Sequence, residues 1–443
     1  MKLWQKEITI DKKVESFTIG KDREFDMLLA EFDVIGSLAH TEMLCQCELI
    51  SNEEKTQIHF GLKKILSEIR KGEFVIEQNC EDIHSQIEFS LTEMIGEAGK
   101  KIHTARSRND QSLLDIKLFC RDEIKKTVSS TEKFFHSLIE LSEKYKDKLL
   151  PGYTHLQLAM PSSFGLWFGA YAESLCDDLE LMQAAYAIAD KNPLGSAAGY
   201  GSSFPINREL TTELLGFSGM NVNSVYAQMT RGKTEKTVSI ALAGIASTLS
   251  KLSMDCTLFM NQNFGFISFP ENLTTGSSIM PHKKNPDVWE MIRGKCNRIQ
   301  SLPNEFSLLL ANLPSGYHRE LQLTKEILFP AFKELQSCLE MAEFMLQQII
   351  VKKNILDNKK YDFLFTVDAV NNEVKTGIPF RDAYRKIGME VENDIFEKSE
   401  EITHTHTGSI GNLGNSLLNA RFLSKIEDFS FEKIENALNK LCI

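Results

Sequence analysis

Glycine and proline are scarce in this sequence, which has 25 glycines and 11 prolines among 443 residues. Their scarcity excludes collagen-like and low-complexity disordered chains. Hydrophobic residues make up 42% and charged residues 25%, a balance typical of a soluble, helix-rich globular protein. Since the chain is about three times as long as a common domain, we expect two or three domains that share helices.

Basic residues and paired cysteines are also lacking. Lys and Arg total 50 against 61 Asp and Glu, and the net charge of −11 argues against nucleic acid as a partner. The nine cysteines are scattered without a C-x-x-C pair, so we expect reduced core thiols. No apolar leader follows residues 1–6, and the most apolar later segment, residues 238–250, is too short to span a bilayer. These features predict a cytoplasmic protein with no membrane partner.

Three long spans contain almost no helix-breaking residue. Residues 100–150 have neither Gly nor Pro, residues 233–264 have a single Gly, and residues 331–376 again have neither. Apolar residues recur in the first span at mostly helical spacings, which predicts one long buried helix. The polar run at 352–354 predicts a break between two helices in the third span. The fold class is therefore expected to be all-α, an elongated bundle of long helices.

Helices of this length extend beyond the radius of a small domain, so the same helices of other copies are the simplest cover for their apolar faces. We expect a homo-oligomer. We divide the chain into an N-terminal domain at 1–105, a central long-helix bundle at 106–355 and a C-terminal helical domain at 356–443.

The loop at residues 272–287 interrupts the helical pattern with reactive and charged side chains. It contains the adjacent hydroxyls of Ser277 and Ser278 and two lysines, and Asn285 before Pro286 predicts an N-cap and first-turn pair. Hydroxyls, lysines and a helix N-terminus suit an anion whose charge grows during a reaction. An ordinary polar loop is the alternative.

Two other polar segments adjoin the longest expected helix. His155 stands beside Thr154 in the segment 152–157, which we place at the end of that helix; it is either a catalytic acid or base or a structural histidine. Residues 101–111 lie at its start, where Arg106 or Arg108 could grip a carboxylate. A solvated, capped helix start is the alternative for this second segment.

Glu81, His84 and Glu88 have the spacing of one helical face. A metal site would have this spacing, but no cysteine or second histidine supports it, so we expect no metal. The segment 192–199 lacks the helix that follows a phosphate-binding glycine loop, and we expect a turn that supports the site.

Taken together, these motifs resemble a known enzyme family. Residues 276–286 (GSSIMPHKKNP) resemble the signature loop of the fumarase, aspartase and argininosuccinate lyase superfamily. Residues 103–111 (HTARSRNDQ), 152–157 (GYTHLQ) and 192–196 (NPLGS) resemble its argininosuccinate lyase branch, in the same order. The resemblance implies a homotetramer with a central twenty-helix core and active sites assembled from three subunits. It also implies β-elimination of argininosuccinate to arginine and fumarate in arginine biosynthesis, a small-molecule reaction that needs no cofactor or metal.

The resemblance also assigns roles to individual residues. Ser277 is the favoured base, Lys283 stabilises its alkoxide, and His155 pairs with Glu290; the reverse assignment of base and acid to Ser277 and His155 stays open. The substrate-binding residues that it implies are His84, Ser107, Arg108, Asn109, Thr154, Asn285, Tyr317, Gln322 and Lys325.

The sequence departs from the family pattern near the arginine end of the substrate. The departures are at Gly232, His318, Leu323 and Thr324 and in the stretch 18–26, which lacks the family's serine. An N-acylated argininosuccinate, such as an N-succinyl form, is therefore an alternative substrate if Lys21, Arg23 or Arg319 adds positive charge there. Another fumarate-releasing lyase is a second alternative. A crystallin-like structural protein is the non-enzyme alternative, against which the intact catalytic residues argue.

Overall fold

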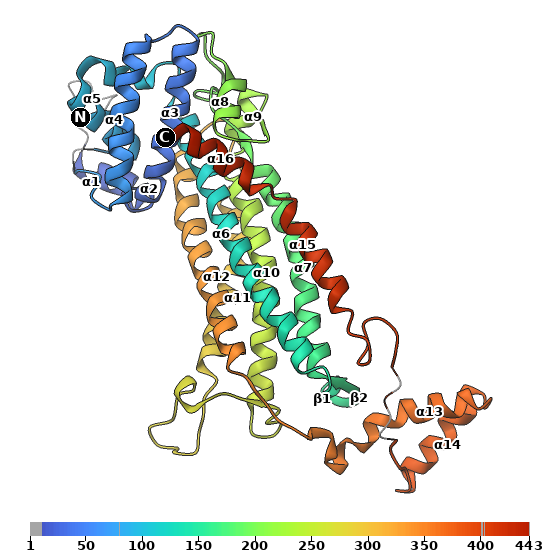
Figure 1. Ribbon diagram of the computed structural model, residues 1–443. Coiled ribbons are helices and arrows are strands. Elements are labelled where there is room, and N and C mark those ends of the chain that lie inside the picture. Colours follow the sequence, from blue (N-terminus) through green and yellow to red (C-terminus); the bar gives the residue numbers. More distant parts are fainter. Residues whose placement is uncertain (1–10, 79, 400–401, 403, 443) are drawn as a thin grey trace.

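The computed structural model describes residues 11–78, 80–399, 402 and 404–442, and long antiparallel helices dominate it (Figure 1). The bundle consists of α6 (Arg108–Lys144), α7 (Phe164–Ala189), α10 (Lys233–Met260), α11 (Asp287–Leu309) and α12 (Leu323–Gln347). Strands in the described part form only short pairs: β1 (Leu149–Thr154) with β2 (Gln157–Ser163), β3 (Lys191–Asn192) with β4 (Gly219–Met220), and β5 (Ile267–Ser268) with β6 (Ile350–Val351). The expected all-α, elongated fold class is confirmed.

Helix α6 confirms the single long helix predicted within residues 100–150, and its start has a local cause. The Ser107 hydroxyl accepts the N–H of Asn109 at 3.2 Å, while the Asp110 carboxylate accepts the N–H of Ser107 at 2.9 Å. This reciprocal capping satisfies backbone donors that a helix start leaves free. With 37 residues, α6 is about 55 Å long, so the two ends of the bundle are far apart.

Helix α10 occupies the centre of the bundle, packed against α7, α11 and α12. The argument that residues 238–250 are too short to cross a bilayer was wrong for this helix, which has 28 residues and is long and apolar enough to do so by composition. However, 56% of its most apolar window is buried inside the bundle. Val238, Ile245 and Leu249 are completely buried there, as expected of a core helix.

The third span without Gly or Pro, residues 331–376, does not coincide with the helices of the structure. Helix α12 begins at Leu323, before the Gly- and Pro-free span, and it contains Pro330 as an interior residue. A break between two helices is confirmed, because α12 ends at Gln347 and α13 (Thr366–Lys375) begins after two short 3₁₀ turns. Asn354, within the predicted break, has a left-handed backbone with φ of 57°.

Smaller helices cover the two ends of the bundle (Figure 1). One end carries a head with its own hydrophobic cluster, formed by α1 (Lys12–Ile19), α2 (Asp22–Asp26), α3 (Ala30–Gln46), α4 (Asn52–Arg70) and α5 (Ile83–Ile95), with α8 (Arg208–Leu214) and α9 (Ser224–Met229) nearby. The β1–β2 hairpin, α13 and α14 (Phe380–Glu392) lie at the opposite end. Helices α15 (Asn415–Glu427) and α16 (Phe431–Cys442) return along the bundle, so that α16 contacts α3.

All nine cysteines are unpaired thiols, and six of them are buried. The expectation of reduced cysteines is confirmed, although Cys45, Cys47 and Cys442 are half-buried rather than in the core.

Candidate active site

A polar cavity of about 220 Å³ lies where the head meets the bundle. Chain segments that are distant in sequence form its wall: the starts of α2, α5, α6 and α12 and the 3₁₀ turn Arg319–Gln322. Six of the predicted substrate-binding residues line it, namely His84, Arg108, Asn109, Tyr317, Gln322 and Lys325. A seventh, Ser107, caps α6 beside it.

Lys325 is buried in the cavity wall between two carboxylates. Its ammonium forms ion pairs with Asp22 and Asp26 of α2. Burial opposes the charge of Lys325, but the negative charges of Asp26 and Asp22 outweigh it and raise its pKa. The sequence flagged the stretch 18–26 for a missing serine and for the positive charge of Lys21 and Arg23, and neither aspartate was predicted as a site residue.

Arg231 is a second cavity residue that the sequence did not indicate. Its guanidinium donates to the Ser112 hydroxyl at 3.0 Å and to the Leu321 carbonyl at 3.1 Å, and it pairs with buried Glu235. The next residue, Gly232, has φ of 82°, and a Cβ there would lie 2.5 Å from Leu310. The glycine noticed as a departure from the family pattern therefore has a steric cause.

A residue of another helix in the head orients the His84 ring. Asp82 is the N-cap of α5, so Glu81 precedes the helix, and the expected single face of Glu81, His84 and Glu88 was wrong. The His84 ring bonds through Nδ1 to the buried carboxylate of Asp33 on α3. His84 thus connects the cavity wall to a buried acidic cluster.

His155 lies at the tip of the β1–β2 hairpin, not at the end of α6 as expected. Thr154 and Gln157 pair across the turn, and both turn residues, His155 and Leu156, have left-handed φ angles of 54° and 58°. Such angles are costly for residues other than glycine, and they place the His155 ring in solvent. Thr154 is likewise exposed.

The loop before α11 holds the remaining predicted residues. The Ser277 hydroxyl accepts the N–H groups of Ile279 at 3.4 Å and Met280 at 3.2 Å. Lys283 in the loop and Glu290 in the first turn of α11 are exposed. Two backbone donors therefore already point at the serine oxygen.

Asn285 closes this loop rather than capping α11. The helix begins at Asp287 after Pro286, without a side-chain cap, so the predicted N-cap role of Asn285 was wrong. Instead, its backbone N–H donates to the Thr275 carbonyl at 2.8 Å, and its amide donates to the Thr275 hydroxyl and the Gly276 carbonyl.

The turn expected at 192–199 is present, and α6 anchors it. The Asp110 carboxylate accepts the N–H groups of Gly195 at 3.0 Å and Ala197 at 2.9 Å. This links the turn to the start of α6, next to the cavity.

A single chain does not bring all the predicted residues together. The cavity lies at the head end, whereas the His155 hairpin and the Ser277 loop lie at the opposite end of the bundle (Figure 1). Within the described residues, His155 forms no hydrogen bond with Ser277 or Glu290. The predicted site therefore consists of three separated groups in one copy of the chain.

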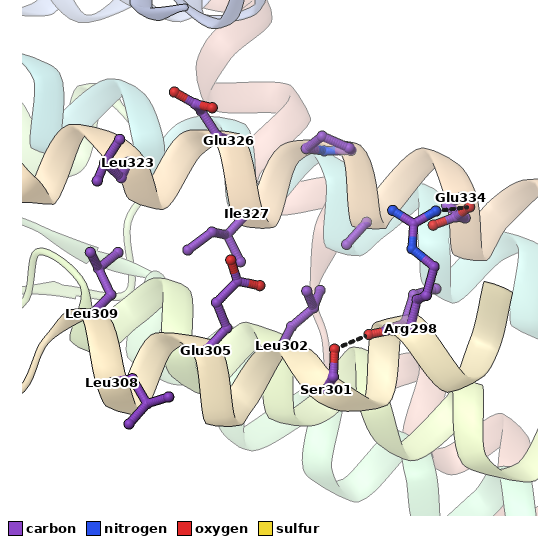
Figure 2. Close-up of a pocket in the computed structure, with 13 residues that line it drawn as sticks. Arg298, Ser301, Leu302, Glu305, Leu308, Leu309, Leu323, Glu326, Ile327 and Glu334 are labelled. Atoms are coloured by element: carbon purple, nitrogen blue, oxygen red, sulfur yellow. Dashed lines mark hydrogen bonds and ion pairs between the residues drawn. The ribbon is translucent and has the colours of Figure 1, made fainter. Parts of the chain in front are cut away.

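A larger cavity of about 630 Å³ between α11 and α12 contains none of the predicted residues. Figure 2 shows Leu302, Leu309, Ile327 and Glu305 directed into the space between the two helices, while Glu326 points away from it. Since none of the predicted residues line this cavity, it is a less suitable candidate site than the polar cavity.

The comparisons with known proteins identify a family from the sequence and a fold from the structure. A family model described as Lyase matches residues 5–301. The proteins named argininosuccinate lyase from Parabacteroides distasonis and Bacteroides fragilis are 56% and 55% identical to the chain over 440 and 436 residues, which is 99% and 98% of both sequences. The crystal structure of EDDS lyase in complex with formate has the same fold, with a TM-score of 0.77, 20% identity and coverage of 98% of this chain and 95% of that one. The chain belongs to the argininosuccinate lyase family of carbon–nitrogen lyases.

Proposed function

We propose that the enzyme cleaves argininosuccinate to arginine and fumarate by β-elimination, as a step of arginine biosynthesis. The observation that carries this proposal is the identity of more than half of the residues, over nearly the full length, with proteins named argininosuccinate lyase. The residues implied for elimination are all present, and six of the substrate-binding residues surround one polar cavity.

The reaction removes a proton from a carbon beside a carboxylate and so produces a dianionic intermediate. Ser277 acts as the base; the N–H groups of Ile279 and Met280, together with Lys283, stabilise its alkoxide. His155, oriented by Glu290 of another copy, protonates the departing guanidine nitrogen. Asn285 and Thr154 bind the fumarate-side carboxylates, and the cavity at the head binds the remainder of the substrate.

The active enzyme is a homotetramer in which three copies contribute to each site around a central core of twenty helices. The distance between the three groups of residues supports this assembly, since α6 alone separates two of them by about 55 Å. Exposed apolar residues on the bundle helices support it too. Leu308 and Leu323, beside the groove in Figure 2, are 71% and 46% exposed in one copy, and neighbouring helices would cover them.

The division into domains at 1–105, 106–355 and 356–443 is part of the same proposal. Separate hydrophobic clusters in the head and in the bundle support the first boundary. A small cluster of Val370, Ala383 and Ile387 between α13 and α14 supports the third unit, although α15 and α16 pack elsewhere. Nine unpaired cysteines support a cytoplasmic location.

An N-acylated argininosuccinate is a less favoured substrate. Its extra acyl carboxylate would need a cation, but Arg319 is paired with Glu81 at 3.2 Å and Arg23 donates to the Gln78 carbonyl. Asp22 adds a negative charge in the cavity wall. A free α-ammonium group suits these carboxylates better, and family membership makes a purely structural, crystallin-like role less favoured as well.

A substrate panel tests the proposed function. Fumarate release is followed by ultraviolet absorbance with argininosuccinate, its N-acetyl and N-succinyl forms, and adenylosuccinate, using His155→Asn as the inactive control. Argininosuccinate should give the highest kcat/KM. Preference for an acylated form would change the substrate, and a flat trace with every compound from folded enzyme would remove the proposed activity.

A further inference from the structure

Behind the cavity lies a buried cluster of three ionisable side chains from three helices. Asp33 of α3 and Asp115 of α6 are each 1% exposed, and His84 of α5 is 8% exposed, on the cavity wall. One side-chain nitrogen or oxygen atom of each residue lies within 4.8 Å of the corresponding atom of the other two. Neither aspartate touches the cavity, so any role they have in the reaction must act through His84.

Asp33 is surrounded by donors, as an ionised carboxylate requires. It accepts from His84 Nδ1, from the Gln111 amide at 2.9 Å and 3.1 Å, and from the Ser37 hydroxyl at 3.3 Å. Burial opposes its charge, but the positive charges of His84 and Arg106 and the bonds from His84 and Gln111 together lower its pKa. Asp33 therefore carries the negative charge of the cluster.

Asp115 has the opposite environment. Within the described part of the chain, no donor reaches either of its buried oxygens. His84 Nδ1 is 3.6 Å away and already bonded to Asp33. Burial, and then the charge of Asp33, raise the pKa of Asp115 well above its ordinary value. A second carboxylate beside Asp33 would repel it, whereas a neutral carboxylic acid supplies an O–H to it.

We propose that Asp115 is a positioning residue that shares a proton with Asp33, and that this acid–carboxylate pair holds His84 as an imidazolium in the wall of the substrate cavity. Nδ1 is committed to Asp33, so Nε2 is the nitrogen that can reach a ligand. A charged Nε2–H is a strong donor to a carboxylate. The pair thus gives the cavity a cation of fixed direction, and this inference rests on the proposed function.

Other charged groups around His84 favour the same state. Burial opposes protonation of the ring, but Asp33, Asp82 and Asp26 together raise its pKa. Arg106 is a positive group that faces the cluster. His103 also faces it, but burial and then the charges of Arg106 and Arg108 lower its pKa to about 4, so it is neutral between pH 6 and 9. In the proposed imidazolium state both ring nitrogens carry protons, so the His84 ring has no lone pair to offer a metal ion.

The test compares Asp33→Asn with Asp115→Asn, measuring KM and kcat for argininosuccinate from pH 6 to 9. Asp33→Asn removes the charge that holds the imidazolium, so KM should rise about 10- to 100-fold at pH 8 with a smaller change in kcat. The loss should shrink as the pH falls, because acid protonates His84 again. Asp115→Asn keeps a neutral donor beside Asp33 but loses the shared proton, so KM should rise much less than in Asp33→Asn and keep the wild-type pH dependence.

Asp178→Asn is the matched control. Asp178 is another buried carboxyl group of the bundle, bonded to the Thr248 hydroxyl and outside the cavity wall. Its variant should keep the wild-type KM, and thermal melting checks the folding of all three. If Asp115→Asn raises KM as much as Asp33→Asn, Asp115 works as an anion and the proposal is wrong. An unchanged KM profile in Asp33→Asn also overturns it. Should Asp33→Asn not fold, Asp115→Asn still tests whether Asp115 works as an anion, because a large rise in KM that shrinks at low pH in this variant would overturn the proposal.

Failure of the proposed function is distinguishable from failure of this inference. Wild-type enzyme that releases no fumarate from argininosuccinate removes the function itself. Active wild-type enzyme with two insensitive aspartate variants removes only the role of the buried pair.

Discussion

The hydroxyl of Ser277 is the residue on which the proposed chemistry depends most directly. Its oxygen already accepts two backbone N–H groups, and an alkoxide would accept the same bonds more strongly. Ser277→Ala should therefore lower kcat by about 100- to 10,000-fold, the range expected for loss of a general base. Melting temperature should stay the same, because the loop contributes little to folding.

Ser278→Ala is the control for this prediction, since Ser278 is an exposed neighbour with the same side chain. Steady-state fumarate release gives kcat for both variants. Turnover near the wild-type value in Ser277→Ala would exclude this serine as the base and leave His155 in that role.

At the residue scale, the sequence indicated many of the residues that line the cavity but not the ion pairs between them. The family resemblance grouped Asn109, Tyr317 and Gln322, and all three line the cavity although Asn109 is far in sequence from the other two. It could not indicate that Lys325 would be paired with Asp22 and Asp26, because that pairing depends on how α12 packs against α2. Arg231 was missed for the same reason, since two of its partners, Ser112 and Leu321, lie in segments that are distant from it in sequence.

At the element scale, α6 carries a buried lysine whose charge should make stability depend on pH. Lys117 is completely buried, and its ammonium donates to the Asn221 side chain at 2.9 Å. Burial lowers its pKa from an ordinary 10.5 to about 8. Between these values the unfolded chain binds a proton that the folded chain does not, so stability should rise with pH in that window.

Lys117→Met should abolish this dependence. The free energy of unfolding of the wild type relative to the variant should increase by about 3 kcal/mol from pH 8 to pH 10.5. Urea unfolding at one fixed protein concentration measures it, with exposed Lys133→Met of the same helix as the control. If the difference in unfolding free energy between wild type and Lys117→Met stays constant across this range, folding does not lower the pKa of Lys117 and the prediction is wrong.

The long helices were predictable from sequence, whereas the hairpin was not. The scarcity of Gly and Pro indicated where α6 and α10 lie, because these residues are unfavourable in the interior of a helix. The same rule failed at Pro330, which α12 accommodates. The β1–β2 hairpin was not predicted because its turn residues, His155 and Leu156, are not of the Asn-Gly type that indicates a two-residue turn.

At the scale of the whole molecule, one chain keeps the groups of the proposed site apart. The head cavity holds the groups that would bind substrate, while exposed His155 and half-buried Ser277 lie at the other end. In an antiparallel arrangement of copies, the far end of one bundle would lie beside the head of another, so that the separated groups would meet between copies. The sequence predicted sharing between copies only through helix length and resemblance, and the separation along α6 adds a geometric reason.

Mixing two inactive variants tests shared sites most directly. Co-expression of His155→Asn and Asn109→Leu chains with different tags allows mixed tetramers to be purified and assayed for fumarate release. If each site takes its cavity and its hairpin from different copies, some sites in a mixed tetramer carry neither change, and activity should recover well above that of either parent. Mixed tetramers as inactive as both parents would show that each chain completes its own site, and would contradict the account.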